Sequence, residues 1–195
     1  MGTIRFNRFA WIYDRFMHAF SLYRHGEIRR HLPETLLDRL LDVGGGTGFV
    51  ASQIADLFHQ RVVIDPAMKM LKRADERDVT TCCGSALELP FQENQFDCVL
   101  CTDALHHIKN VPEALSEMTR VLKPGGQLVI LEFHIVGSAG KLFWLFEKLW
   151  IDNSKFVTPS ELGTMLSEHN MEFTTHRLSC IEYLVVAKKP LEVTL

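Results

Sequence analysis

The sequence has 195 residues and lacks any apolar run of about 18 to 20 residues, the length that a helix needs to cross a bilayer. Residues 1–8 carry charge but none of the apolar segment that signal peptides contain. We therefore expect a protein without a transmembrane segment, located in the cytoplasm.

A strong excess of one charge is also missing. Twenty-one Lys and Arg stand against 24 Asp and Glu, a formal net charge of -3, so the chain as a whole is not a basic nucleic-acid binder. The charge is uneven, because residues 1–31 hold six Arg against only Asp14 and Glu27. This first segment either contacts an anionic substrate or surface, or carries solvated arginines on a helix.

Cysteines are few and odd in number, five in all, and four of them fall in short apolar runs typical of strands. Cys98 and Cys101 spell C-x-x-C, but on a strand their side chains point to opposite faces of the sheet. We expect neither a disulfide framework nor a metal site.

No repeat or linker interrupts the chain, and 47% of its residues are hydrophobic, which indicates one domain with a substantial core. Apolar runs predict strands at 39–43, 61–64, 79–83, 96–101 and 127–133, and a terminal hairpin of 172–178 and 181–188. Helical patterns lie between them. The predicted fold is α/β, a doubly wound Rossmann-like sheet of seven strands, mostly parallel with an antiparallel C-terminal edge.

Three helix starts are marked by capping residues. Asp65 can cap a helix whose first residue is Pro66. Asn110 with Glu113, and Thr158 with Glu161, have the spacing of capping boxes.

Two aromatic segments lie outside this alternation. In residues 6–20, five rings recur at spacings of 3 and 4, which predicts a helix with one aromatic face; we expect residues 1–34 to form a helical cap on a core of 35–195. A second aromatic helix is expected at about 140–150. Either face can line a pocket for an apolar ligand, pack as core, or form a homodimer contact. The rings of the first face are Phe6, Phe9, Tyr13, Phe16 and Phe20.

The strongest local signal is Leu-Asp-Val-Gly-Gly-Gly-Thr-Gly at residues 41–48, where a strand runs through glycines into a helix. Such a turn exposes backbone N–H groups to a polar or anionic ligand. Gly46, Gly48 and Ala51 fit the dinucleotide fingerprint, whereas Asp42, Gly44, Gly46 and Gly48 fit the S-adenosylmethionine turn. Local spacing does not decide between them.

Further blocks follow in order: Ile-Asp-Pro at 64–66, Gly-Ser-Ala-Leu-Glu-Leu-Pro-Phe at 84–91, Ala-Leu-His-His at 104–107 and Arg-Val-Leu-Lys-Pro-Gly-Gly at 120–126. With the glycine turn they resemble the class I methyltransferases, and among them the branch of the menaquinone and ubiquinone biosynthesis enzymes. The resemblance implies a methyl transfer from S-adenosylmethionine to a small, apolar or aromatic molecule. It also leaves open a cofactor-binding partner or regulatory subunit without catalysis of its own.

Carried over residue by residue, the resemblance implies the cofactor contacts. The glycine turn approaches the methionine part, Asp42 orients the turn or the ammonium group, and Asp65 accepts the ribose hydroxyls or serves only as a helix cap. Ser85 stands where the family usually has Asp for the adenine amino group, which weakens that contact by about 1 kcal/mol. The residues implied to bind the cofactor are Tyr13, Asp42, Gly44, Gly46, Gly48, Asp65, Pro66, Ser85, Ala86, Leu87 and Thr102.

A catalytic base is needed only if the methyl acceptor must lose a proton. His106, His107 and His134 follow the fourth and fifth core strands, at the edge where doubly wound folds bind ligands. His107 matches the family's more regular histidine, and either a base or a structural hydrogen bond accounts for it. His134 has only its location in its favour. We take His107 and His134 as the catalytic candidates.

Overall fold

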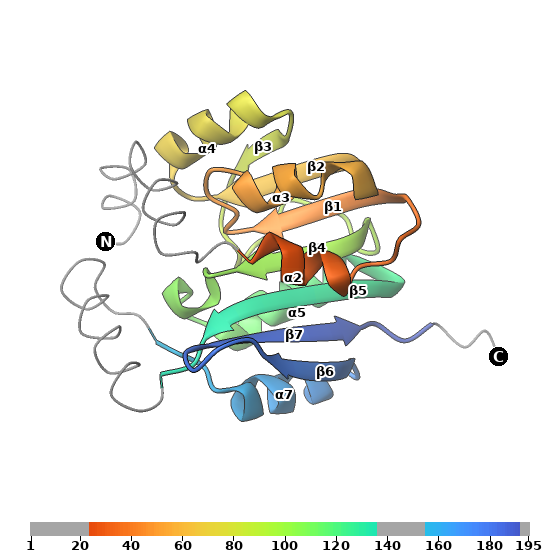
Figure 1. Ribbon diagram of the computed structural model, residues 1–195, viewed down its shortest axis with the longest axis vertical. Coiled ribbons are helices and arrows are strands. Elements are labelled where there is room, and N and C mark those ends of the chain that lie inside the picture. Colours follow the sequence, from red (N-terminus) through yellow and green to blue (C-terminus); the bar gives the residue numbers. More distant parts are fainter. Residues whose placement is uncertain (1–23, 136–154, 192–195) are drawn as a thin grey trace.

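The computed structural model describes residues 24–135 and 155–191 (Figure 1). Within these ranges, seven strands form one sheet in the order β3-β2-β1-β4-β5-β7-β6. The strands are β1 (Leu37–Val43), β2 (Phe58–Asp65), β3 (Thr80–Cys83), β4 (Phe96–Thr102), β5 (Leu122–Phe133), β6 (Glu172–Arg177) and β7 (Glu182–Lys188).

Helices cover both faces of the sheet. Residues of α2, α3 and α4 join one buried cluster, and residues of α5 and α7 join the other. The helices are α2 (His25–Arg30), α3 (Phe49–Gln53), α4 (Met68–Ala74), α5 (Val111–Val121) and α7 (Pro159–Glu168), and single 3-10 turns are η1 (Ala55–Leu57), η2 (Asp75–Arg77) and η3 (Leu105–His107).

The central strands β4 and β5 contain apolar runs without alternation because both of their faces are covered, whereas the edge strands β3 and β6 are more polar and more exposed. Leu40 and Leu41 of β1 belong to opposite clusters. Cys98 and Cys101 of β4 also divide between the two clusters, and all five cysteines are free thiols. The expectation that the C-x-x-C residues face opposite sides is confirmed.

The five strands β3, β2, β1, β4 and β5 are parallel, and the last two strands give the sheet its antiparallel part. β7 runs opposite to β5, from Phe133 paired with Glu182 to Gln127 paired with Lys188. β6 then pairs antiparallel with β7 as the edge strand. The predicted fold class, a mostly parallel seven-stranded sheet with an antiparallel C-terminal edge, is confirmed.

The largest difference from the expected boundaries lies between α5 and β5. Here α5 ends at Val121 and β5 begins at once with Leu122, five residues before the predicted strand start. The register with β4 shifts between Phe96 and Cys98, which accommodates the Pro124 region as an irregularity. Gly126 allows this path, because a Cβ there would lie 2.9 Å from the Asp97 carbonyl oxygen.

One predicted helix start and one predicted capping interaction differ from the structure, although α5 does begin after Asn110 as expected. The Asn110 side chain donates to Glu113 Oε2 at 2.9 Å and makes no capping bond to the backbone, so this capping box is not formed. α4 begins at Met68 rather than at Pro66, because Asp65 accepts the Ala67 N–H in a tight turn before the helix. The Thr158–Glu161 capping box is present at the start of α7.

The start of the described chain is anchored to β7 near the end of β5. Ile28 and Leu32 pack into the cluster under α3, and Arg24 donates two hydrogen bonds to Glu182 of β7, from Nε to Oε1 at 3.0 Å and from Nη2 to Oε2 at 2.5 Å. The predicted aromatic helices at 6–20 and 140–150, and with them Tyr13, lie outside the described residues.

Candidate functional site

The glycine turn connects the end of β1 to α3. In the sheet, β1 lies between two parallel neighbours, β2 and β4. Gly44, Gly46 and Gly48 all have positive φ, at 70°, 56° and 69°. A Cβ on Gly44 would lie 2.6 Å from the Ala104 Cβ, so the turn is both left-handed and tightly packed. Strand order reverses here, which is where doubly wound sheets bind ligands.

Asp42 lies beneath this turn with no exposed surface. Neither carboxylate oxygen has a hydrogen-bond partner among the described residues. Burial, and then the charge of Asp65, raise the pKa of Asp42 to about 7. A Cβ on Gly45 would lie 2.5 Å from the Asp42 Cγ, so only glycine leaves room for the carboxylate. A buried acceptor of this kind calls for a ligand that donates or carries positive charge.

Asp65 ends β2 on the same edge of the sheet. Its Oδ2 accepts the Gly46 N–H at 3.1 Å and its Oδ1 accepts the Ala67 N–H at 2.7 Å. Burial raises the pKa of Asp65 to about 6, against the lowering effect of these two bonds. The carboxylate is therefore fixed beside the glycine turn, while neighbouring Pro66 is exposed.

The loop after β3 brings three more predicted residues to this edge. Gly84 N–H donates to the Asp65 carbonyl oxygen at 3.4 Å. The exposed Ser85 hydroxyl accepts the Leu87 N–H at 3.1 Å. Ala86 and Leu87 are half-buried. The loop that carries Ser85, which the sequence predicts to bind the adenine, thus lies beside Asp65, which it predicts to bind the ribose.

The end of β4 supplies the other side. Thr102 is half-buried at the last position of the strand, and Asp103 has a positive φ of 50° and donates its N–H to the Leu131 carbonyl oxygen. His107 lies on η3, and burial followed by the nearby His106 lowers the pKa of its imidazole well below the usual value. The His134 ring lies edge-on to Tyr183, with 6.1 Å between the ring centroids.

The sequence interpretation named His106 but did not connect it to Glu132. Both side chains are buried, and His106 Nδ1 lies 2.6 Å from Glu132 Oε1. The signal available was an acid two residues before His134 at the end of a predicted strand; nothing local pairs it with a histidine 26 positions earlier.

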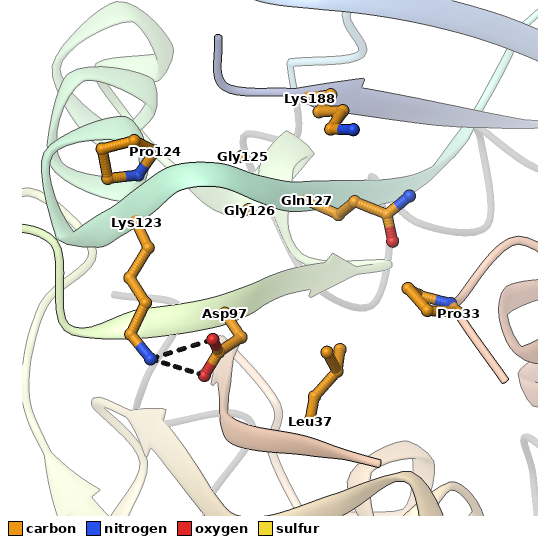
Figure 2. Close-up of a pocket in the computed structure, with 9 residues that line it drawn as sticks. All are labelled: Pro33, Leu37, Asp97, Lys123, Pro124, Gly125, Gly126, Gln127 and Lys188. Atoms are coloured by element: carbon orange, nitrogen blue, oxygen red, sulfur yellow. Dashed lines mark hydrogen bonds and ion pairs between the residues drawn. The ribbon is translucent and has the colours of Figure 1, made fainter. Parts of the chain in front are cut away.

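A separate hollow of about 220 Å³ lies at the opposite edge of the sheet, where the parallel strands begin (Figure 2). Asp97 and Lys123 form an ion pair at its side, with both Nζ···Oδ distances 2.8 Å. No predicted site residue lines it. The lining residues are Pro33, Leu37, Asp97, Lys123, Pro124, Gly125, Gly126, Gln127 and Lys188.

Residues 24–135 and 155–191 contain no helix long and apolar enough to span a membrane. In the same residues, no three His, Cys, Asp or Glu side chains gather as metal ligands would.

Comparison with known proteins identifies the central part of the chain. Residues 41–130 match the model of the family described as methyltransferase domain. The chain is 38% identical over 105 residues to the demethylmenaquinone methyltransferase of Corynebacterium urealyticum, covering 54% of this chain and 46% of that protein. It is also 38% identical over 121 residues to the ubiquinone/menaquinone biosynthesis C-methyltransferase UbiE of a Ruegeria species, covering 55% and 48%. The chain thus spans about half the length of these relatives.

A solved structure agrees on the fold. The Thermotoga maritima protein described as a SAM-dependent methyltransferase, possible histamine N-methyltransferase, superposes with a TM-score of 0.80 at 20% identity, over 95% of this chain and 98% of that one. The resemblance to class I methyltransferases stated from the sequence blocks is confirmed.

Proposed function

We propose that this chain, whose residues 41–130 form a methyltransferase domain, transfers the methyl group of S-adenosylmethionine to a small molecule. The observation that carries the proposal is Asp42, a fully buried carboxylate under a left-handed glycine turn with no partner among the described residues. A ligand ammonium group held by the turn would supply the missing charge. This requirement favours S-adenosylmethionine over NAD, which has no primary ammonium group.

The cofactor contacts follow the carboxyl edge of the sheet. Asp42 would hold the ammonium group, Asp65 the ribose hydroxyls, and Ser85 with the backbone of Ala86 and Leu87 the adenine. Asp65 is suited to this role because both oxygens are already oriented by backbone N–H groups. Thr102 would line the methionine side, with Gly44, Gly46 and Gly48 allowing close approach and Pro66 flanking the ribose.

When bound, S-adenosylmethionine supplies an electrophilic methyl group on a positively charged sulfur. Since positive charge leaves sulfur during transfer, a carboxylate beside the sulfur would stabilise the ground state more than the transition state. The carboxylates of this chain therefore serve the ends of the cofactor. Alignment of the acceptor with the methyl group can lower the barrier by roughly 7 to 11 kcal/mol.

For the acceptor, we propose an apolar or aromatic small molecule, in keeping with relatives named for quinone biosynthesis. Residues 1–34 would cap the site, with Tyr13 at the methionine end of the cofactor, and a homodimer located in the cytoplasm is the proposed assembly. Removal of residues 1–20 should lower cofactor affinity and abolish transfer. Truncated protein that binds S-adenosylhomocysteine as well as the full chain would contradict the cap.

The proposal is tested by a thermal-shift panel of S-adenosylmethionine, S-adenosylhomocysteine, NAD and NADP. At about 100 times its dissociation constant, a ligand adds roughly 2.7 kcal/mol to the free energy of unfolding, an easily measured shift. Stabilisation by NAD alone would contradict the proposal. Cofactor binding without transfer to any acceptor would favour the second candidate, a cofactor-binding partner subunit.

A further inference from the structure

A histidine and a glutamate form a buried pair at the carboxyl edge of the sheet. Glu132 is the penultimate residue of β5, and His106 lies on η3 after β4. His106 Nδ1 is 2.6 Å from Glu132 Oε1, and the two side chains are 1% and 0% exposed. A pair this deeply buried is costly unless its remaining hydrogen-bonding groups are satisfied.

Backbone groups satisfy the carboxylate and fix its orientation. Glu132 Oε2 accepts the His106 N–H at 3.0 Å, and Oε1 also accepts the Phe133 N–H at 2.7 Å. A carboxylate held by these donors is an acceptor toward the imidazole as well, so His106 Nδ1 carries the hydrogen. In the neutral ring this leaves Nε2 as the basic nitrogen.

Packing holds the imidazole in place. The Phe156 ring stacks on the His106 ring, with 4.9 Å between the centroids and 17° between the ring planes. The centroid of the His107 ring on η3 lies 3.9 Å from that of His106. The His106 carbonyl oxygen accepts the Lys155 N–H at 2.9 Å, which fixes the backbone at the same point. A side chain so constrained does not have to be ordered during a reaction.

The pair also lies next to the proposed cofactor turn. Ala104, two residues before His106, has its Cβ 2.6 Å from the position that a Cβ on Gly44 would occupy. The segment that carries His106 is thus packed directly against the glycine turn that we propose holds the methionine end of S-adenosylmethionine.

We propose that Glu132 positions His106 so that His106 Nε2 takes the proton that the methyl acceptor loses. The inference rests on the proposed function. The acceptor's O–H or ring C–H bond breaks as a bond to the methyl carbon forms, its proton moves to Nε2, and the S–CH3 electron pair remains on sulfur. The products are the methylated acceptor, the neutral thioether and an imidazolium paired with Glu132.

The surrounding groups favour His106 over His107 as the base. Burial and the nearby His106 lower the pKa of His107 well below its usual value, so His107 holds a proton poorly. Cys101 on β4 and Tyr183 on β7 also face Glu132, and burial raises the pKa of each far above its usual value. Both therefore stay neutral, and Glu132 supplies the negative charge that an imidazolium at His106 requires.

The sharpest variant is His106→Asn, because the asparagine amide can still donate to Glu132 while Nε2 is lost. Glu132→Gln tests the positioning role, and His59→Gln, on the exposed surface of β2, is the matched control. Each is assayed with S-adenosylmethionine and a panel of dihydroxy-aromatic acceptors, with reduced 1,4-naphthoquinone and catechol among them. Affinity for S-adenosylhomocysteine is measured by calorimetry in parallel.

We expect His106→Asn to lower kcat by about 100- to 10,000-fold, the usual effect of losing a general base. The dissociation constant of S-adenosylhomocysteine should change by less than about twofold. The wild-type kcat should fall toward acid pH, and that limb should be absent in the residual activity of His106→Asn. Glu132→Gln should lower kcat by about 10- to 100-fold with little change in KM, and His59→Gln should match the wild type.

Turnover by His106→Asn close to the wild-type rate would overturn the inference and leave the proposed function standing. The inference is also wrong if the wild type binds S-adenosylhomocysteine but methylates none of these acceptors. No binding of S-adenosylhomocysteine by the wild type would instead remove the proposed function. Should both variants fail to fold, imidazole ¹⁵N NMR of the wild type decides, since a His106 ring protonated on Nε2 instead of Nδ1 contradicts it.

Discussion

Two carboxylates at opposite edges of the sheet, the partly exposed Asp97 and the fully buried Asp42, differ in whether their charge is matched. At the amino edge, Asp97 accepts the Arg39 N–H at 2.9 Å and pairs with Lys123, so its charge is matched. At the carboxyl edge, on the neighbouring strand β1, Asp42 is fully buried and has no partner among the described residues. Since an unmatched buried carboxylate lowers stability, the chain keeps Asp42 at a cost that a ligand can offset.

The open hollow and the unpartnered carboxylate of Asp42 lie at opposite edges of the sheet. The hollow in Figure 2 lies beside the satisfied carboxylate, at the edge without predicted site residues. The glycines with positive φ and the carboxylates with raised pKa values lie at the other edge. In this molecule, unsatisfied polar groups identify the site better than an open hollow does.

The largest expected effect is on the pH dependence of the free energy of unfolding, to which Asp42 contributes. Its pKa is raised to about 7 in the folded protein, so its contribution to stability is complete below about pH 4 and is lost as pH rises through 7. The loss is about 4 kcal/mol, and Asp65 adds a smaller loss of the same sign. Asp42→Asn should therefore remove most of the fall in stability of the ligand-free protein between pH 5 and pH 8.

Urea unfolding at the two pH values measures this, with S-adenosylhomocysteine affinity as a second readout. Affinity should fall in Asp42→Asn at both pH values. An unchanged pH slope in the variant would mean that Asp42 is matched by a partner in the folded protein, and the contrast between the edges would fail.

Gly44→Ala should have the next largest effect. The new Cβ would combine a positive φ with a 2.6 Å approach to Ala104. We expect a loss of about 2 to 4 kcal/mol in the free energy of unfolding and at least a tenfold loss of cofactor affinity. Gly26→Ala in α2 is the control, because none of the described residues has an atom within 4 Å of a Cβ at that position, and it should raise stability by about 0.5 to 1 kcal/mol. Equal behaviour of the two variants in melting and calorimetry would show that the turn is not constrained.

Asp65→Ala should weaken S-adenosylhomocysteine binding by about 1.5 to 3 kcal/mol, because it removes charge-assisted bonds to two hydroxyls. Asp56→Ala, which breaks only an exposed pair with Arg29, is the control and should leave affinity unchanged. Calorimetry on both folded variants measures the difference. Unchanged affinity in Asp65→Ala would reduce Asp65 to a turn residue that holds Gly46 and Ala67.

Asp97→Asn should lower stability without changing cofactor affinity. It weakens the Lys123 ion pair and should lower the free energy of unfolding by about 1 to 2 kcal/mol, since the pair is partly exposed. Cofactor affinity should stay as in the wild type. A marked loss of affinity would show that the amino edge also contributes to binding.

The smallest effect concerns Ser85, where the family usually has an acid. Ser85→Asp should tighten binding of S-adenosylhomocysteine by up to about 1 kcal/mol, with solvent screening the gain because Ser85 is exposed. Ser116→Asp, exposed on α5, controls for added charge. Weaker binding in Ser85→Asp would mean that backbone groups alone hold the adenine, or that the pocket is shaped differently from the family's.

Much of the fold could be predicted because strand and turn signals are local. The apolar runs located the centres of the strands, and the Thr158–Glu161 box formed as its spacing indicates. What failed depended on distant contacts. The path of residues 122–126 is set by the backbone at Asp97, and Asn110 donates to Glu113 instead of capping α5.

The candidate site divides in the same way. The glycine turn and Asp65 were readable because a few adjacent residues define them. The burial of Asp42 without a partner was not readable, since the neighbours that exclude water from it come from several strands. The pairing of His106 with Glu132 follows from β4 and β5 being adjacent and in register, which no local pattern contains.

The bonds between Arg24 and Glu182 join residues 158 positions apart. A ribosome releases the arginine long before the strand that receives it, and the closure of so long a loop carries a large entropic cost. We expect the anchoring of α2 to be a late event in folding, after β7 has inserted beside β5. In this order of events α2, the first helix of the described chain, reaches its final position only after β7, the last strand, is in the sheet.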